Sequence, residues 1–316
     1  VPEPGPGEVR VRLVRAGVNP TDWKFRAGMM RGHDEVTPGH DGAGVVDAVG
    51  EGVAWPAVGD EVVVDPSTSC GACDACRAGD VPFCASFRIL GEHRWGTHAD
   101  AVVVPATNAV PRPRSLSWEA AAAFGLDVSS AVRIARRARV GAGMTVLVVG
   151  VGGGSATAAF LVARALGATV LATSTKEAGR AWATEHGAIA AFDSAAAYDE
   201  EARAAVPGGV EVVVDNVGTA TFERSLRALA RGGRLVTNGS TSGRTAELHL
   251  PTLFWRQLEV IGATMNDHDE FAEAVRLVAD GAVRLPVDTV YAFEDYPAAL
   301  ARLEAGDRLG ALVLAR

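Results

Sequence analysis

The sequence predicts an α/β protein of two domains, one rich in β-strands and one built on a parallel sheet with helices on both faces. Its 316 residues are enough for two domains of ordinary size. Residues 8–15 alternate polar and apolar side chains, as a half-buried strand does. From residue 144 onward, short apolar runs alternate with helical stretches, which is typical of a parallel sheet flanked by helices.

The first third of the chain consists of short apolar runs separated by Gly and Pro. The strands expected there cover residues 8–15, 44–49, 61–64 and 101–104. After Pro113 the composition changes, and an Ala-rich helical stretch begins with Ser115 or Ser117 as its N-cap.

The second part begins with a strand over residues 144–149, a glycine loop at 150–155 and a helix over 156–166. Further strands are expected over residues 168–173, 210–215, 233–238 and 258–263. The last stretch predicts helices over 271–281 and 290–306 and a strand over 311–315. On sequence grounds alone, these last elements can close either domain.

Composition and charge exclude several classes of function. The formal charge of -8 and the pI near 5.4 provide no basic face for a phosphate backbone, so nucleic-acid binding is disfavoured. No apolar run has the length needed to span a bilayer, and the first ten residues do not resemble a signal peptide. We therefore expect a cytoplasmic protein.

All four cysteines lie in one short stretch with the spacing C-x2-C-x2-C-x7-C, at Cys70, Cys73, Cys76 and Cys84. Four thiolates this close together suit a closed tetrahedral zinc site of the structural kind. The alternative is a pair of disulfides in a secreted chain, which the absence of a signal peptide disfavours. If zinc uses all four, no cysteine remains for a second metal site.

A glycine-rich loop between the first strand and the first helix of the second part has the context of a dinucleotide-binding fingerprint. It consists of Gly150, Gly152, Gly153, Gly154 and Ser155. The first glycine allows a tight turn, the second lets the backbone approach a pyrophosphate, and the helix N-terminus supplies free N–H groups. The alternative is a purely structural turn.

The end of the second strand discriminates between the two nicotinamide dinucleotides. An acidic residue there would bind the 2′-hydroxyl of NAD, but Ser174, Lys176 and Arg180 occupy this region instead. Hydroxyls and cations fit a 2′-phosphate, so we expect NADP(H), with NAD(H) as the less favoured cofactor. The alternative is that Lys176 and Arg180 form only the solvated face of the next helix.

The residues resemble the medium-chain dehydrogenase/reductase superfamily. Residues 39–44 (GHDGAG) are similar to the G-H-E-x-x-G signature of zinc alcohol dehydrogenases, and the four-cysteine stretch resembles their structural zinc loop. The segment 215–218, with Asn216, and the strand end at Asn238 and Gly239 also have counterparts, as does the Leu309-Gly310 terminus. The resemblance covers essentially the whole chain.

This resemblance implies a Rossmann doubly wound parallel sheet plus a β-rich GroES-like catalytic domain that carries a structural zinc lobe. Residues 1–115 and 266–316 would form the catalytic domain and residues 116–265 the dinucleotide-binding domain. Asn216 and Asn238 would contribute to the cofactor site.

The catalytic zinc of that family is held by two cysteines and the signature histidine. By the resemblance, Asn19 matches the first cysteine position, the second cysteine falls near Leu126, and only His40 remains. Asn is a poor zinc ligand and Leu is none, so a structural zinc is expected and a catalytic one is not. An unorthodox site remains open, in which His40 is joined by some of Asp41, Asp127, His33, His93 and His98.

Residues 17–28 (GVNPTDWKFRAG) instead resemble the zinc-free quinone oxidoreductases, with Asn19, Pro20, Asp22, Arg26 and Gly28 matching. Without a metal, reduction of an activated double bond needs less help than reduction of a simple ketone, because hydrogen-bond donors can stabilise the charge on a conjugated oxygen. We therefore expect hydride transfer to a quinone, enone or related activated carbonyl compound.

The resemblance places Asn19, Asp22, Trp23, His40, Leu126 and Ser130 near nicotinamide and substrate. His40 would donate to the substrate oxygen or to ribose hydroxyls, and Trp23 would form a pocket wall. Asp22 and Arg26 can equally well pair to hold the backbone. Two other functions stay open: a zinc-dependent alcohol or aldehyde dehydrogenase with an unorthodox metal site, and a non-catalytic NADPH-binding protein.

Residues 258–265 form a strongly β-prone segment late in the parallel sheet. In the family this strand lies at the sheet edge and pairs with a second subunit. Because an unpaired apolar edge is prone to aggregate, we expect a homodimer or a homotetramer built from such dimers.

Overall fold

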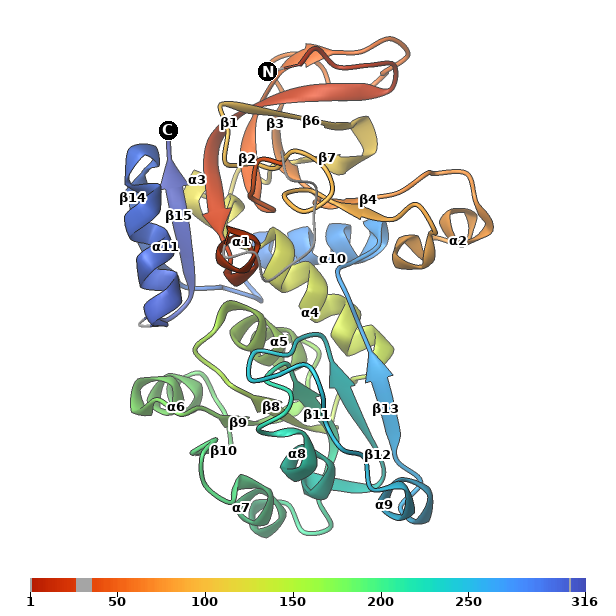
Figure 1. Ribbon diagram of the computed structural model, residues 1–316, viewed down its shortest axis with the longest axis vertical. Coiled ribbons are helices and arrows are strands. Elements are labelled where there is room, and N and C mark those ends of the chain that lie inside the picture. Colours follow the sequence, from red (N-terminus) through yellow and green to blue (C-terminus); the bar gives the residue numbers. More distant parts are fainter. Residues whose placement is uncertain (1, 27–35, 307) are drawn as a thin grey trace. The chain divides into compact units, whose positions relative to one another are not determined.

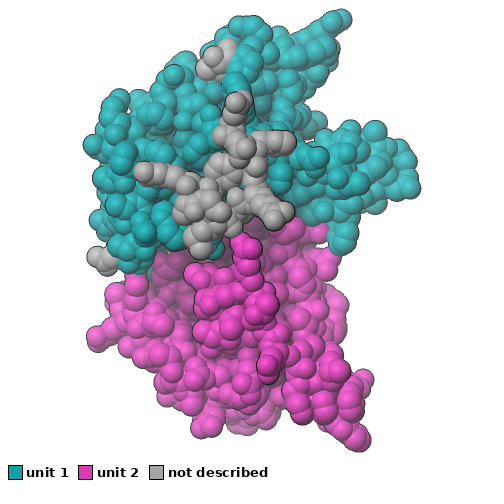
Figure 2. Space-filling model, viewed as in Figure 1, with its two compact units in different colours: residues 1–129, 265–316 teal, residues 130–264 magenta. Residues whose placement is uncertain are grey.

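The structure is a computed structural model that describes residues 2–26, 36–306 and 308–316. The side chains of Phe25 and Arg26 are outside this description, as is all of His33, so the expected roles of Arg26 and His33 fall outside the described residues. The chain divides into two compact units, residues 1–129 with 265–316, and residues 130–264 (Figure 2).

The first unit is built on a mostly antiparallel sheet in which β1 occupies the centre. The strand order is β14-β15-β1-β2-β3-β7, and β6 also pairs with β1. The strands are β1 (Glu8–Val18), β2 (Gly42–Val49), β3 (Glu61–Val64), β6 (Ala101–Pro105), β7 (Ala109–Pro111), β14 (Val287–Ala292) and β15 (Ala311–Ala315). The predicted β-rich fold is therefore confirmed.

Helices and short turns complete the first unit. The helices are α1 (Pro20–Arg26), α2 (Asp74–Arg77), α3 (Trp118–Ala121), α10 (His268–Ala279) and α11 (Tyr296–Ala305), with 3₁₀ turns η1 (Val81–Phe83), η2 (Ala106–Asn108) and η3 (Phe293–Asp295). Helix α4 (Gly125–Arg137) begins in the first unit and continues into the second. The segment with β4 (Ser67–Thr68), α2 and β5 (Arg88–Ile89) projects from the sheet as a lobe (Figure 1). We call residues 67–89 the cysteine lobe.

The last stretch of the chain joins the first unit, because β15 pairs with β1 in antiparallel register, from Arg15 opposite Ala315 to Val18 opposite Leu312. Apolar residues of β1, β15 and α11, among them Val18, Leu300 and Leu314, pack into one buried cluster. A second buried cluster joins β1, β2, β3 and β6 through residues such as Val11, Val62 and Val104.

The first boundary between the units lies at Ser129, whereas the sequence placed it at residue 115. Helix α3 packs on β1, β2 and β14. Phe124 packs on Phe271 of α10, with ring centroids 6.1 Å apart. Residues 116–129 therefore belong to the first unit. The boundary falls inside α4, so no break in the helical pattern marks it.

The second unit contains the parallel sheet that the sequence predicts. Its strand order is β10-β9-β8-β11-β12-β13, the order of a Rossmann sheet. The strands are β8 (Thr145–Val149), β9 (Thr169–Thr173), β10 (Ala190–Phe192), β11 (Val210–Asp215), β12 (Leu229–Thr237) and β13 (Glu259–Gly262). The helices are α5 (Gly154–Ala165), α6 (Glu177–Glu185), α7 (Tyr198–Ala205), α8 (Phe222–Ala228) and α9 (Leu250–Trp255).

Central strands of this sheet are buried on both faces, as continuous apolar sequences predict for parallel strands. Leu147, Leu171, Val213 and Leu235 contribute to its core and have no exposed surface. Within the described residues, no helix is both long and apolar enough to cross a membrane.

The β1–β2 pairing depends on a residue without a side chain at Gly44. A Cβ atom there would overlap the carbonyl oxygen of Arg12 and lie 3.0 Å from the Cα of Leu13. We expect Gly44→Ala to destabilise the first unit by about 1–3 kcal/mol, because the paired strands must move apart. The measurement is urea unfolding of the wild type and the variant.

Gly141→Ala is the matched control, because a Cβ at Gly141 meets no atom within 4 Å and its backbone φ is not in the left-handed region. This control should unfold with the wild-type midpoint. Equal midpoints for the Gly44 and Gly141 variants would show that β1 and β2 can accommodate a Cβ atom at Gly44 without cost.

Candidate functional site

The cysteine lobe brings four thiols together. The ligand atoms of Cys70, Cys73, Cys76 and Cys84 all lie within 4.8 Å of one another. Neighbouring Sγ atoms are 3.5 Å apart for Cys73 and Cys76 and 3.8 Å apart for Cys70 and Cys76. Tetrahedral zinc with Zn–S bonds of about 2.3 Å places its sulfurs about 3.8 Å apart. The four thiols therefore fit a structural zinc ion, and none forms a disulfide.

Local backbone structure orients these thiols toward one point. Cys73 is the N-cap of the single-turn helix α2, which also carries Cys76. The backbone N–H of Ser86 points at Cys84 Sγ at 3.3 Å, and Cys76 Sγ lies 3.3 Å from Ser69 Oγ. Hydrogen bonds from N–H and O–H groups suit thiolates that bind a metal.

A second cluster surrounds His40, which is 1% exposed. Its Nδ1 lies 3.2 Å from Asp22 Oδ1, and its Nε2 lies 3.1 Å from Glu92 Oε1. Asp22 also accepts hydrogen bonds from the backbone N–H groups of Asn19 (2.7 Å) and Gly39 (2.9 Å). The imidazole is therefore held between two carboxylates, one on α1 and one in the loop after β5.

Asn19 and Leu126, which the family resemblance places at or near its cysteine positions, both donate to the same carboxylate. Asn19 Nδ2 donates to Asp41 Oδ2 at 2.9 Å, and the backbone N–H of Leu126 donates to Asp41 Oδ1. Asp41 is 2% exposed. Neither donor can serve as a metal ligand in this arrangement, so the residues present do not fit the family's catalytic zinc.

The other candidate ligands do not gather around His40. His93 Nδ1 accepts from the backbone N–H of Ile89 at 3.3 Å, and His98 Nε2 lies 2.9 Å from the carbonyl oxygen of Gly17. Across residues 2–26, 36–306 and 308–316, the four cysteines are the only group of three or more His, Cys, Asp or Glu residues whose ligand atoms converge.

Burial and pairing shift the pKa values of these groups in different directions. Burial alone would lower the pKa of His40, but hydrogen bonds and charge from Asp22 and Glu92 raise it to about 10. Burial would raise the pKa of Asp22, yet the neighbouring His98 and His40 lower it overall. Burial raises the pKa of Asp41 to about 7, and the charge of Asp127 adds to this rise. A protonated His40 paired with ionised Asp22 is the resulting state at neutral pH.

Trp23 and Ser130, two further predicted site residues, lie in different surroundings. Trp23 in α1 is half-buried and packs against the apolar cluster of β15 and α11. Ser130 is buried in α4, one residue beyond the boundary of the first unit. Leu126 is half-buried in the first turn of the same helix.

In the second unit, the predicted glycine loop connects β8 to α5. Gly150 (φ +88°) and Gly152 (φ +116°) adopt left-handed backbone conformations that other residues rarely tolerate. Gly153 is the N-cap of α5 and, having no side chain, makes no side-chain capping hydrogen bond to the start of the helix. The loop lies at the carboxyl end of β8, beside the switch point between β8 and β11, where Rossmann sheets bind dinucleotides.

The residues after β9 are organised by Ser174, which is 4% exposed. Its Oγ accepts from the backbone N–H of Lys176 at 3.3 Å, and its carbonyl oxygen accepts from Arg180 Nη1 at 2.8 Å. Lys176 is the N-cap of α6 and is exposed. Both predicted cations are therefore positioned at the carboxyl end of β9.

Asn216 and Asn238 follow the carboxyl ends of β11 and β12. The carbonyl oxygen of Asn216 accepts from Thr241 Oγ1 at 3.2 Å. The buried Oδ1 of Asn238 has no hydrogen-bond partner among the described residues. A buried acceptor at this sheet edge fits the amide of a bound nicotinamide.

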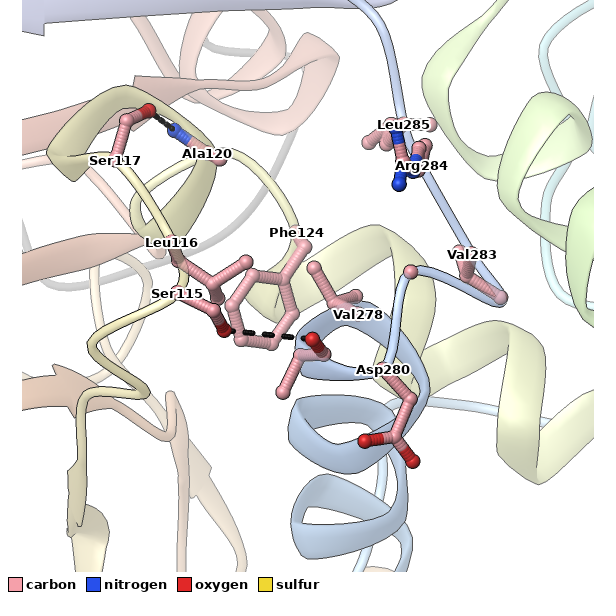
Figure 3. Close-up of a pocket in the computed structure, with 12 residues that line it drawn as sticks. Ser115, Leu116, Ser117, Ala120, Phe124, Val278, Asp280, Val283, Arg284 and Leu285 are labelled. Atoms are coloured by element: carbon pink, nitrogen blue, oxygen red, sulfur yellow. Dashed lines mark hydrogen bonds between the residues drawn. The ribbon is translucent and has the colours of Figure 1, made fainter.

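The first unit also contains a cavity of about 410 Å³ that sequence reasoning did not predict. It is lined by Phe124 and Leu116 on one side and by the end of α10 and the following loop, with Asp280 and Arg284, on the other (Figure 3). A hydrogen bond from Ser115 Oγ to the carbonyl oxygen of Ala279 joins the two sides. None of the predicted site residues lines this cavity.

Comparisons with known proteins agree with this architecture. Residues 5–114 match the alcohol dehydrogenase GroES-like domain, and residues 150–280 match the zinc-binding dehydrogenase domain. The chain is 29% identical to an NAD-dependent alcohol dehydrogenase of Sulfolobus acidocaldarius (99% of this chain, 94% of the relative). It is 30% identical to an acryloyl-coenzyme A reductase of Metallosphaera sedula (99% and 93%).

Among solved structures, a thermostable alcohol dehydrogenase from Pyrobaculum aerophilum superimposes with a TM-score of 0.91 at 35% identity, covering 100% of this chain and 93% of that one. Fold, cysteine lobe and glycine loop together define a zinc-binding dehydrogenase. The chain belongs to the medium-chain dehydrogenase/reductase superfamily and is an oxidoreductase.

Sequence reasoning did not identify Glu92 and Thr21 as part of the His40 cluster. Thr21 Oγ1 lies 3.4 Å from His40 Nδ1. Glu92 is 52 residues from His40 in sequence, and no family motif that we used covers residues 91–98. The only feature of the sequence that could have indicated Glu92 is its place directly before His93 and six residues before His98, in the segment GEHRWGTH.

The cysteine lobe should bind one zinc ion per subunit. We expect Cys73→Ser to lose that zinc and to lower the thermal midpoint, because the lobe has few apolar contacts to hold it without metal. Metal analysis and thermal unfolding measure the two effects. Ala78→Ser, an exposed change in the same lobe, is the control and should keep both wild-type values. A Cys73 variant that kept its zinc would contradict the assignment.

Proposed function

We propose that this protein is an NADP(H)-dependent oxidoreductase that transfers hydride to a quinone, an enone or a related activated carbonyl compound without a catalytic zinc. One observation carries the proposal: Asn19 and Leu126 both donate hydrogen bonds to Asp41 where the family places metal-binding thiolates. A site without a Lewis acid favours acceptors whose negative charge is already delocalised.

The residues present fit a nicotinamide dinucleotide, whose chemistry when bound is hydride transfer. Gly150, Gly152 and the N-terminus of α5 would hold its pyrophosphate, and Asn238 Oδ1 would accept from its carboxamide. His40, protonated between Asp22 and Glu92, would be the source of the proton that the reduced substrate takes up. Asn19 and Asp22 fix the loop that carries His40.

The names of some relatives support the proposed type of reaction. Two of them, from Metallosphaera sedula and Sulfurisphaera tokodaii, are named acryloyl-coenzyme A reductases, a name that implies reduction of a conjugated double bond. Others are named alcohol dehydrogenases, and these favour the alternative of zinc-dependent alcohol oxidation. The hydrogen bonds that Asn19 and Leu126 donate to Asp41 favour the first.

The proposed assembly is a homodimer, or a tetramer of such dimers, formed through β13. This strand is the edge of the parallel sheet and pairs only with β12 among the described strands. Val260 on β13 is 40% exposed, and Phe254 and Trp255 on the preceding helix are 55% and 68% exposed. An apolar edge of this kind is normally covered by another chain.

The reaction is tested by measuring metal content and turnover on one preparation. We expect about one zinc per subunit and NADPH-dependent reduction of quinones or enones, with no oxidation of primary alcohols. Two zinc ions per subunit with chelator-sensitive alcohol oxidation would establish the zinc-dependent alternative instead. Tight NADPH binding without turnover on quinones, enones and aldehydes would establish a non-catalytic role.

The cofactor preference is tested at Lys176. We expect Lys176→Ala to weaken NADPH binding about tenfold and to leave NADH binding unchanged, because only NADPH carries the 2′-phosphate. Fluorescence titration with both nucleotides measures this. Arg231→Ala is the control, since Arg231 is an exposed cation near the amino end of β12, opposite the predicted site. NADH binding tighter than NADPH in the wild type would overturn the preference.

A further inference from the structure

Three side chains form a continuous hydrogen-bonded row that ends at the surface. Asp22 has no exposed surface, His40 is 1% exposed, and the side chain of Glu92 is 12% exposed. The two links of this row are 3.2 Å, from Asp22 to His40 Nδ1, and 3.1 Å, from His40 Nε2 to Glu92. Glu92 is therefore the only member of the row with appreciable access to a ligand.

We infer that Glu92 is the residue that exchanges the proton of the reaction with the substrate, and that His40 and Asp22 act behind it as a buried proton store. The inference rests on the proposed function, because it names the proton donor of that same site. His40 itself cannot reach a substrate in this geometry, since both of its ring nitrogens already face carboxylates and its ring is enclosed.

The charges around His40 favour a stored proton. Asp22 faces it from α1, Glu92 from the loop after β5, and Asp41 follows it directly before β2. His98, from the loop before β6, lies 3.9 Å from the other oxygen of Asp22 and interacts with that carboxylate rather than with His40. Two flanking carboxylates stabilise an imidazolium, which is the form that holds a proton for transfer.

In the reduction of an enone, the β-carbon of the substrate gains a hydride, with two electrons, from a dihydronicotinamide, which is oxidised. The C=C π pair moves onto the carbonyl oxygen, giving an enolate that needs one proton. The Nε2–H bond of His40 breaks as an O–H bond forms on Glu92, and that carboxyl proton passes to the enolate. Water reprotonates the imidazole through Glu92 after product leaves, so one proton is consumed per turnover.

Glu92→Gln tests the inference, because glutamine keeps the size and a hydrogen-bond acceptor but cannot carry the proton. We expect kcat to fall about a hundredfold, with KM and NADPH affinity close to the wild-type values. Glu92→Asp, which keeps the acid, should retain more activity than Glu92→Gln. Glu51→Gln, at an exposed glutamate of the same unit, is the matched control and should keep full activity.

The readout independent of activity is the titration of His40, followed by NMR with ¹⁵N-labelled histidine. We expect the pKa of His40, about 10 in the wild type, to be lower in Glu92→Gln, because one of the two flanking negative charges is gone. Full turnover in Glu92→Gln, or an unchanged His40 titration, overturns the inference alone. A wild type without turnover on any quinone or enone overturns the proposed function and this inference together.

Discussion

Burial of the His40 imidazole between two carboxylates is the constraint on which the rest of the first unit's site depends. A buried charge is tolerated only when it is paired and hydrogen-bonded, so every group that faces His40 must be held in place. Asp22 does this by accepting from the backbone of Asn19 and Gly39, which joins α1 to the segment before β2. Glu92 connects the same imidazole to the loop after β5. Three segments far apart in sequence are thereby fixed around one ring.

The cysteine lobe is held together differently from the His40 cluster, by thiols rather than by buried ion pairs. Most of its residues are half-buried or exposed, so it has little apolar surface to bury and its shape depends on four thiols converging on one point. Because the lobe ends shortly before Glu92, a metal-organised lobe also limits where that carboxylate can lie. In this protein the zinc would therefore contribute to the site through the backbone rather than by contact with the substrate.

The sequence predicted local features well and long-range pairings poorly. The strand positions, the glycine loop and the cysteine cluster follow from short motifs and periodicity, and the structure confirms the β-rich fold and the parallel sheet that they imply. The sequence does not mark the unit boundary inside α4, because the helical pattern continues unchanged across Ser129. Glu92 could not be assigned either, since its partner His40 is 52 residues away and contacts of this kind depend on how loops pack, not on spacing.

The proposed absence of a catalytic zinc, with Asn19 and Leu126 bonded to Asp41, is consistent in charge as well as in geometry. A zinc ion with two thiolates and a neutral histidine has no net charge. Without the metal and the thiolates, the one added positive charge is that of protonated His40, which the carboxylates of Asp22 and Glu92 face. Replacing only one cysteine would leave a charged metal or a bare thiolate in a buried site. Asp41 completes the exchange, because the amide of Asn19 and the N–H of Leu126 satisfy its two oxygens. In the proposed mechanism, the positive charge that a metal would have provided is instead that of protonated His40, which lies between two carboxylates and passes its proton on through Glu92.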